Sequence, residues 1–328
     1  MIMPVTHLRA LASVPLLLAL AFPAAAQDTR PFIDDLGRTV QIPLDPTNIA
    51  TLHDIELSVP LLELGAPVVA SHGRPGPNGT PMIRAALLLT GQDFAEGGIA
   101  DLGHNPIDVE RLTSVQPDLI LTTTWQQASV EQLEKIAPTV VIDTRSGIRD
   151  DFALYDLLAE LTGRSDQLVA LKARYQAQIA QLQRVADLDM TVSAFHAQNG
   201  NLSVWNPYGS FGKVLRDAGF SFPEVIESIP EGTSEQLSAE VLPQLDADVV
   251  IVSYRSDKGE TPLNANAALE EAVPGYCAVL VACQVGRIVL MPREEGWATS
   301  YAGLTMIAYA MTTALGTLDF PAIAHDRN

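Results

Sequence analysis

The sequence predicts an α/β protein of two lobes, each with a central, mostly parallel sheet flanked by helices, joined by one long rigid helix. Three observations support this fold class. A phrase at 108–121, DVERLTSVQPDLIL, returns at 238–251 as SAEVLPQLDADVVI. Short apolar runs alternate with helical patterns along the chain, as expected of parallel sheets covered by helices. Between the two copies, residues 166–186 carry apolar side chains at helical spacing, which predicts a stiff connector.

The repeated phrase predicts the same helix–strand unit in both lobes. In each copy a polar residue, Asp108 or Ser238, is expected to cap a short helix with a glutamate in its first turn. The apolar run that follows predicts a strand buried on both faces. Aligned without a gap, the copies match Glu110 with Glu240, Leu112 with Leu242, Val115 with Leu245 and Asp118 with Asp248.

The first 26 residues are expected to be a cleaved signal peptide. Arg9 precedes an apolar stretch at 10–22, and the small residues at 23–26 suit cleavage after Ala26. The apolar part is too short to span a bilayer, and because no cysteine stands at the cleavage end we expect no lipid anchor. The mature chain is therefore predicted to be periplasmic.

The charge of the mature chain restricts its partners. The sequence has 20 basic residues against 39 acidic ones, and removal of the signal peptide takes away only Arg9, so the formal charge becomes −20. Such a charge argues against nucleic acid or anionic lipid as a partner. It also repels an anionic ligand unless local arginines override it. We expect a monomer.

The N-terminal lobe is expected over 27–148. The stretch 71–81, SHGRPGPNGTP, is so rich in Gly and Pro that we expect no regular structure there. In chain order we expect a hairpin at 35–43, strands at 49–52, 68–70, 119–122 and 140–142, and helices at 55–64, 82–89 and 130–136.

A helical connector is expected over 149–188, and the C-terminal lobe over 189–328. The connector should contain a helix at 151–162, ended by Gly163, and the long helix at 166–186. In the C-terminal lobe we expect strands at 191–195, 202–205, 249–253 and 287–291, and helices at 211–218, 266–273 and 298–315.

Side chains suited to ligand binding follow the predicted strand ends, where open parallel sheets bind their ligands. Arginine forks bind carboxylate or catecholate oxygens, and aromatic faces pack on flat groups. The set contains almost no acid, so it suits a planar or anionic chelate. Its members are His53, Asp54, His72, Arg74, Trp125, Gln126, His196, Asn206, Tyr208, Tyr254, Arg255 and Arg293.

Each member also has a purely structural explanation. Arg74 and Arg255 are compatible with solvated loop charges, and Trp125 and Trp297 with core aromatics that anchor a helix to a sheet. A single imidazole at a strand end is more often a hydrogen-bonded structural residue. Only the concentration of these residues at one edge favours a ligand site.

Cys277 and Cys283 are the only cysteines of the sequence. In an oxidising compartment they are candidates for a disulfide that closes a small loop. The alternative is two buried free thiols at a helix-to-strand corner. Both remain open, because the sequence does not fix the Cβ geometry that a bridge needs.

Enzyme motifs are missing from the sequence. It contains no HExxH, GxGxxG or Walker loop, and the stretch 209–212, GSFG, lacks the leading glycine of a nucleophile elbow. We therefore expect neither catalysis nor a cofactor. A secreted hydrolase that uses His196 or His72 as its base is the remote alternative.

Six stretches that cover nearly all of the mature chain resemble periplasmic substrate-binding proteins of the iron-siderophore and cobalamin class of ABC importers. They are 34–43 (DDLGRTVQIP), 106–121 (PIDVERLTSVQPDLIL), 133–143 (LEKIAPTVVID), 157–164 (LLAELTGR), 210–220 (SFGKVLRDAGF) and 238–253 (SAEVLPQLDADVVIVS).

The resemblance implies two α/β lobes joined by a rigid helix, with the ligand held between them. It implies that Glu110 and Glu240 contact arginines of the dimeric inner-membrane permease. The expected cargo is a ferric siderophore or a related iron chelate. Arginines Arg74, Arg255 and Arg293 would pair with ligand oxygens, and aromatics Trp125, Tyr254 and Trp297 would pack on the ligand, with Tyr208 beside them.

Other cargoes within this class remain open. Hydroxamate binders place an arginine in the loop before the first repeated glutamate, where this chain has His104 and Asn105. Haem, cobalamin or a bare divalent metal are the alternatives, since imidazole suits haem iron and divalent metals. The histidines that would serve are His53, His72, His104 and His196.

Overall fold

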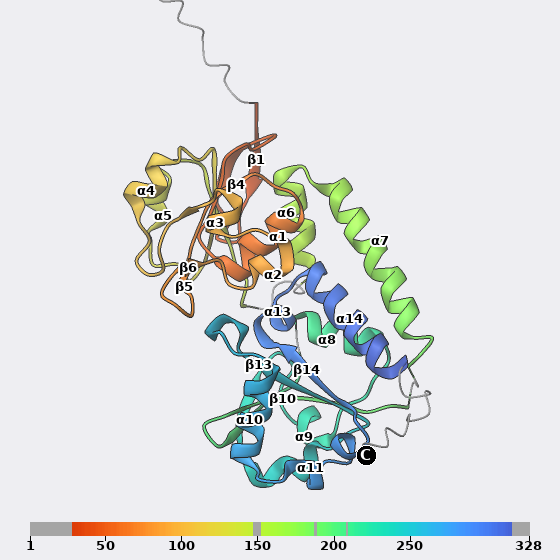
Figure 1. Ribbon diagram of the computed structural model, residues 1–328. Helices are drawn as coiled ribbons and strands as arrows, with labels where there is room; N and C mark the ends of the chain where they lie inside the picture. The colour runs from red at the N-terminus through yellow and green to blue at the C-terminus, as the bar shows by residue number, and fades with distance from the viewer. Residues whose placement is uncertain (1–27, 147–151, 187–188, 208, 317–328) are drawn as a thin grey trace, which may run out of the picture.

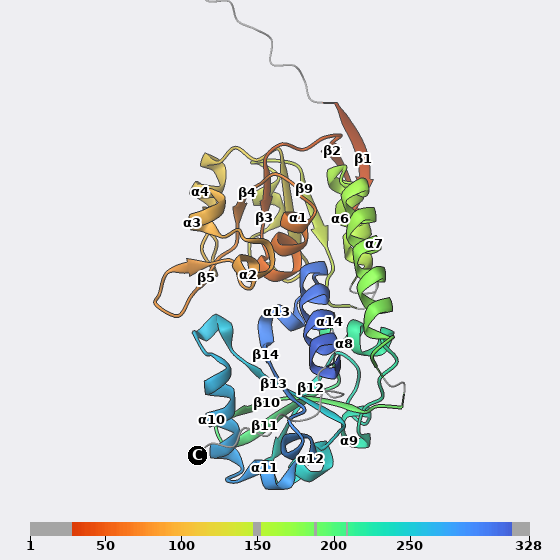
Figure 2. The same ribbon diagram turned by 45° about the vertical axis from the view of Figure 1, so that its right-hand side comes forward.

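A computed structural model describes residues 28–146, 152–186, 189–207 and 209–316. The chain forms two lobes, one above the other in Figure 1, with helix α7 (Ser165–Leu182) running along one side. Figure 2 shows the lobes from a second angle, with α7 and α14 (Tyr301–Gly316) side by side. Each lobe contains one five-stranded sheet. The predicted two-lobe α/β fold class is confirmed.

The five strands of the N-terminal sheet are all parallel, in the order β7-β4-β3-β8-β9. Strands β3, β8 and β9, which run from the centre of this sheet to one of its edges, are buried along their whole length, as their continuous apolar runs predict. The bounds are β3 (Ile49–Thr51), β4 (Val68–Ser71), β7 (Ala100–Asp101), β8 (Leu119–Thr123) and β9 (Thr139–Ile142), and an antiparallel hairpin joins β1 (Thr29–Ile33) to β2 (Thr39–Pro43).

The absence of regular structure predicted for 71–81 is wrong. Two short strands, β5 (Arg74–Pro75) and β6 (Pro81–Met82), pair there in an antiparallel hairpin. Prolines are tolerated in this ribbon because both of its strands are edge strands, so a missing N–H need not break a hydrogen bond to a neighbour. Gly79, at φ +75°, allows the chain to reverse between them.

The helices of the N-terminal lobe are short. The helix predicted at 55–64 begins as a π-helix and continues as an α-helix, so it is two elements. In order they are η1 (Asp54–Ser58), α1 (Val59–Glu63), α2 (Ala86–Thr90), α3 (Phe94–Gly97), α4 (Val109–Ser114) and α5 (Val130–Leu133).

Two helices connect the lobes. Helix α6 (Ala153–Thr162) ends at Gly163, whose left-handed conformation was expected of a C-terminal cap. Helix α7 follows at once and is about 27 Å long. Its apolar stripe includes Leu168, Tyr175 and Ile179, all buried against the core. The connector is therefore a packed helix rather than a flexible linker.

The C-terminal sheet is mixed. Strands β10 (Val192–Gln198), β13 (Val249–Tyr254) and β14 (Ile288–Pro292) are parallel, and β11 (Asn201–Trp205) and β12 (Ser234–Ser238) extend the sheet antiparallel beyond β10. Strand β12 was not predicted, because this edge strand is mostly exposed and carries polar residues. The helices are α8 (Gly209–Asp217), α9 (Glu224–Glu227), η2 (Ala239–Leu245), η3 (Ser256–Lys258), α10 (Pro262–Ala272), α11 (Tyr276–Val279), α12 (Val281–Gln284), α13 (Arg293–Trp297) and α14.

The repeated phrase has the same structural role in both lobes. Asp118, just before β8, accepts hydrogen bonds from the backbone N–H and the hydroxyl of Thr47 at 2.7 and 2.9 Å. Asp248, just before β13, accepts the same two bonds from Thr191 at 2.8 and 2.9 Å. Each threonine leads into a strand that pairs in parallel with the strand after the aspartate. The matched acids thus hold equivalent strand pairs together.

The helices before those strands differ. The side chain of Asp108 accepts from the N–H of Arg111 at 2.9 Å and caps α4 as predicted. The predicted cap by Ser238 is wrong, because its side chain makes no capping hydrogen bond. The second copy is a 3-10 helix with Pro243 inside it, where the first copy has Thr113. Proline has no N–H to donate, which disfavours an α-helix at this position.

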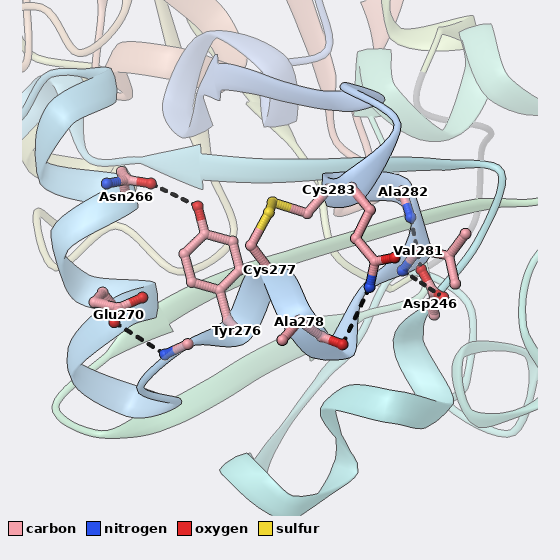
Figure 3. The surroundings of a disulfide bond; sticks show 11 residues. Asp246, Asn266, Glu270, Tyr276, Cys277, Ala278, Val281, Ala282 and Cys283 are labelled. Atoms are coloured by element: carbon pink, nitrogen blue, oxygen red, sulfur yellow. Dashed lines mark hydrogen bonds between the residues drawn. A yellow bond between two sulfur atoms is a disulfide. The ribbon is translucent and has the colours of Figure 1, made fainter.

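Cys277 and Cys283 form a disulfide, with their Cα atoms 5.0 Å apart. Figure 3 shows that the bridge joins the short helices α11 and α12. The N–H groups of Val281 and Ala282 donate to the carboxylate of Asp246, at 2.9 and 3.2 Å. The disulfide therefore closes a small loop that is also held to the segment before β13.

One carboxylate of the N-terminal lobe binds the start of α14. Glu63, at the end of α1, accepts from the N–H groups of Tyr301 and Ala302 at 3.0 and 2.7 Å and from the Ser300 hydroxyl at 2.7 Å. The Tyr155 hydroxyl of α6 also donates to it. An acid at this end of a helix satisfies free N–H groups and interacts favourably with the helix dipole.

Replacing Glu63 by alanine should destabilise the protein. Four charge-assisted hydrogen bonds are lost and their donors are left partly buried, so we expect the free energy of unfolding to fall by about 2–4 kcal/mol. Urea denaturation measures this. Glu160→Ala, which removes an exposed partner of Arg30, is the control and should cost under about 0.5 kcal/mol. An equal loss in both variants would contradict the role of Glu63.

Candidate functional site

Two arginines of the N-terminal lobe meet at Asp54, the first residue of η1, three residues beyond the end of β3. Arg74 Nε lies 2.6 Å from Asp54 Oδ2, and Arg84 Nη2 lies 3.3 Å from Asp54 Oδ1. Asp54 is fully buried. Burial alone would raise the pKa of its carboxyl, but Arg84, with His53 and Arg74, outweighs burial and holds that pKa well below its usual range. Asp54 is therefore ionised at neutral pH.

Glu294, in α13, is the corresponding acid of the C-terminal lobe. Its Oε1 lies 3.3 Å from Arg255 Nε and 3.3 Å from Arg293 Nη1. Its Oε2 lies 3.4 Å from Nη1 of Arg84, which belongs to the other lobe. Glu294 is only 4% exposed. Arg84 thus links the acids of the two lobes.

These six residues form one group, which we call the inter-lobe charge cluster: Asp54, Arg74, Arg84, Arg255, Arg293 and Glu294. The three predicted arginines are brought together here, but the prediction that the strand ends carry almost no acid is wrong. Glu294 lies two residues beyond β14 and was left out of the predicted set. Arg84 was also missed, because the sequence placed it inside the helix expected at 82–89, whereas it lies between β6 and α2.

Three of the predicted histidines cluster in the N-terminal lobe. His72 Nε2 lies 3.0 Å from His104 Nδ1, and the rings of His53 and His72 stack with centroids 6.0 Å apart. The edge of His53 meets Trp125 at 4.4 Å between centroids. Burial lowers the pKa of His53 to about 3 and that of His72 to about 4, so both are neutral at pH 7.

The structure gives no support to a bare metal site at these histidines. Within the described residues, no group of three or more His, Cys, Asp or Glu side chains is placed to hold a metal ion. His196 lies in the other lobe, where its Nδ1 is 2.8 Å from the Ser253 carbonyl oxygen. Its pKa is lowered mainly by burial, with Arg293 and Arg255 adding to the effect, so it borders the inter-lobe charge cluster.

The predicted aromatic residues are divided between the lobes. Trp125 lies under the guanidinium of Arg145, 4.2 Å from its ring centroid. Trp297 lies against the guanidinium of Arg293 at 3.4 Å and meets the edge of the buried Trp205 at 5.1 Å. Tyr254, half-buried, ends β13. Tyr208 lies outside the described residues.

The lobes also touch at the edge away from α7. Gly259, after η3, lies so close to Pro77 of the β5–β6 hairpin that a Cβ on the glycine would be 3.2 Å from the proline Cβ. Figure 1 shows the β5–β6 hairpin reaching toward the lower lobe. The inter-lobe charge cluster therefore belongs to an interface with contacts at both edges, Glu63 with α14 at one and Pro77 with Gly259 at the other.

A cavity of about 310 Å³ lies elsewhere, beside the connector. Its charged groups are already paired, Lys172 with Asp156 at 2.5 Å and Lys213 with Asp217 at 2.9 Å. It contains none of the predicted ligand residues. Its lining is Phe152, Ala153, Asp156, Lys172, Tyr175, Gln176, Lys213 and Tyr301.

Glu110 and Glu240, the matched glutamates of the repeated phrase, are both exposed. Each lies in the first turn of the short helix that precedes a buried strand, α4 before β8 and η2 before β13. Both are thus accessible to a partner.

A family described as "Periplasmic binding protein" matches residues 90–273. The chain belongs to this family. Its members are solute-binding transport components rather than enzymes, and the family implies an extracytoplasmic location. In the part of the chain that the structure describes, no helix combines the length and the apolar character needed to cross a membrane.

Similar proteins include siderophore binders. The iron(3+)-hydroxamate-binding protein YxeB of Bacillus subtilis is 31% identical over 233 residues, which span 68% of this chain and 66% of YxeB. The chain thus matches just under two thirds of that relative. Unliganded FhuD2 from Staphylococcus aureus has a TM-score of 0.67 at 20% identity, over 89% of this chain and 99% of FhuD2. Staphylococcus aureus SirA complexed with staphyloferrin B has a TM-score of 0.66 at 21% identity, over 88% and 99%.

The two buried histidines should make stability depend on pH. Their pKa values in the folded protein, about 3 and about 4, lie below the value of 6.5 for an unfolded chain, so the unfolded chain binds more protons between pH 4 and 6.5. Their contribution is complete above pH 6.5 and is lost as the pH falls. Each should contribute a slope of about 1.4 kcal/mol per pH unit.

Urea denaturation between pH 5 and 6.5 measures that slope. The double variant His53→Gln/His72→Gln should have a mean slope shallower by about 2 kcal/mol per pH unit than the natural protein, because the unfolded histidines are only partly protonated near pH 6.5. The single variant His72→Gln should show about half of that difference. Parallel pH profiles for all three proteins would contradict the assignment.

Proposed function

We propose that the protein is the solute-binding component of an ABC importer, which binds a ferric siderophore between its lobes and delivers it to the membrane permease. The observation that carries this proposal is the inter-lobe charge cluster. Four guanidinium groups from both lobes meet at the carboxyl ends of the two sheets, where open α/β sheets bind their ligands. The periplasm, reached through a signal peptide at residues 1–26, is the proposed compartment.

The residues of the cluster suit an iron chelate chemically. Arginine donates in a planar fork to the anionic oxygens that surround ferric iron in a siderophore. Trp297, held against Arg293, and Trp125, on the N-terminal side, would pack on flat parts of the ligand. The names of YxeB and of the SirA complex, which refer to iron(3+)-hydroxamate and to staphyloferrin B, support a siderophore as the cargo class.

Ligand entry between the lobes can be tested by closing the edge away from α7. In the double variant Pro77→Cys/Gly259→Cys, the Cβ atoms would be close to the distance of a disulfide, about 3.8 Å. We expect the oxidised variant to bind ferric siderophores at least about tenfold more slowly than its reduced form, as measured by quenching of tryptophan fluorescence.

The natural protein and both single variants are the controls for this experiment. They should show no such redox dependence, which separates the new bridge from that between Cys277 and Cys283. Rapid binding by a fully cross-linked variant would place the ligand outside the interface.

The matched glutamates should act in delivery. Glu110→Arg/Glu240→Arg should abolish siderophore-dependent growth of cells that depend on this importer, because the charges offered to the permease are reversed. Siderophore affinity of the purified variant should change less than threefold. Glu131→Arg/Glu235→Arg reverses two other exposed glutamates and should transport normally. A loss of affinity in the first variant would contradict this division of roles.

A further inference from the structure

We propose that Glu294 and Asp54 are specificity-determining residues, which make the inter-lobe charge cluster select an uncharged or cationic iron(III) chelate over a trianionic one. This inference rests on the proposed function. A chelate of ferric iron with three monoanionic bidentate groups, such as hydroxamates, has no net charge. With three dianionic groups, such as catecholates, it carries three negative charges.

The arginines of the cluster are already neutralised within the protein. Arg84, Arg255 and Arg293 all contact the carboxylate of Glu294, at 3.3–3.4 Å. Arg74 contacts Asp54 at 2.6 Å. The fork of Arg255 is also engaged, with Nε and Nη2 both 2.6 Å from the carboxylate of Asp257.

The charges of the site therefore nearly cancel. Four guanidinium groups face the carboxylates of Asp54, Asp257 and Glu294, and two further acids lie close by. Glu260 accepts a hydrogen bond from the backbone N–H of Arg255 at 2.7 Å, and Glu295 accepts one from the hydroxyl of Ser256 at 2.6 Å. Burial raises the pKa of Glu295. The site does not carry the surplus of positive charge that a trianion needs.

Burial makes this balance decisive. Asp54 and Glu294 are 0% and 4% exposed, so water screens them little, and charges in such surroundings interact several times more strongly than in water. A trianion would lose hydration and would meet arginines that already have partners. The formal charge of the chain, −19, also opposes the approach of an anion. An uncharged chelate avoids the loss of hydration and the repulsion by the chain. Its oxygens can still accept hydrogen bonds from arginine N–H groups that point away from the carboxylates.

A purely structural role for the two acids would have a different consequence. If Glu294 only held the lobes together, its loss would weaken binding of every chelate alike. If it sets the charge of the site, its loss removes one counter-ion from each of three arginines and changes the preference between chelates. The ratio of two affinities therefore separates the roles, whereas stability alone does not.

The test uses a hexadentate ferric tris-hydroxamate and a hexadentate ferric tris-catecholate, titrated by tryptophan quenching. The natural protein should bind the uncharged chelate at least about tenfold more tightly. Glu294→Gln keeps the size of the side chain and should raise the ratio of tris-catecholate affinity to tris-hydroxamate affinity at least about tenfold. Asp54→Asn should shift the ratio in the same direction. Glu160→Gln, which breaks an ion pair outside the cluster, is the control and should leave the ratio unchanged.

The outcomes separate this inference from the proposed function. A natural protein that binds neither chelate overturns the proposed function. A natural protein that binds the tris-catecholate as tightly as the tris-hydroxamate, or tighter, overturns only the present inference. That comparison needs no variant, so the inference stays testable if Glu294→Gln does not fold. An unchanged ratio in a folded Glu294→Gln protein also overturns it.

Discussion

The carboxylate of Glu63 receives the first N–H groups of α14 across the boundary between the lobes, and the geometry of the inter-lobe site depends on it. Helix α14 packs along α7 and α8 and also contacts α1 and α2 of the N-terminal lobe. Its start can therefore shift only if these hydrogen bonds break. Tyr155 of α6 shares the same carboxylate, so the connector is tied to this point too. The side of the interface next to α7 is thus a packed and hydrogen-bonded joint.

The inter-lobe charge cluster has a different character. Its contacts are ion pairs between long side chains, several of them at 3.3–3.4 Å, and its arginines remain 18–29% exposed. A guanidinium group of such a pair can take an oxygen of another partner in place of the carboxylate, whereas the N–H groups of a capped helix start are held in one arrangement. In the proposed function, the joint beside α7 would stay closed while ligand oxygens replace carboxylate oxygens as partners of the arginines between the sheets.

The fold was largely predictable from the sequence because its signals are local or repeated. The apolar runs of β8 and β13 and the matched acids Asp118 and Asp248 specify equivalent units, and the structure uses both acids in the same way. The repeat was misleading at the helix before β13, where Pro243 disfavours an α-helix and the chain forms a 3-10 helix. Local composition also misled at 71–81, because pairing between two short strands is a tertiary property.

The site was less predictable, because its chemistry depends on pairs that are distant in sequence. The arginines Arg74, Arg255 and Arg293 follow strand ends and were found by that rule. Of the acids that neutralise them, Asp54 belonged to the predicted set, but Glu294 was overlooked although it stands next to Arg293. Arg84 lies 210 positions from Glu294, and no local pattern could indicate their contact. A count of arginines at strand ends therefore overestimates the positive charge of the site.

The position of Arg84 has a consequence for how such a receptor can change its cargo. Because this side chain comes from one half of the molecule and one of its two counter-ions from the other, neither half balances its own charge. A charge-changing substitution in one half therefore alters the charge that the other half has to balance. If the cluster selects the cargo as proposed, the preference is a property of the matched pair of halves, and recombination between related receptors at the connector would disrupt it.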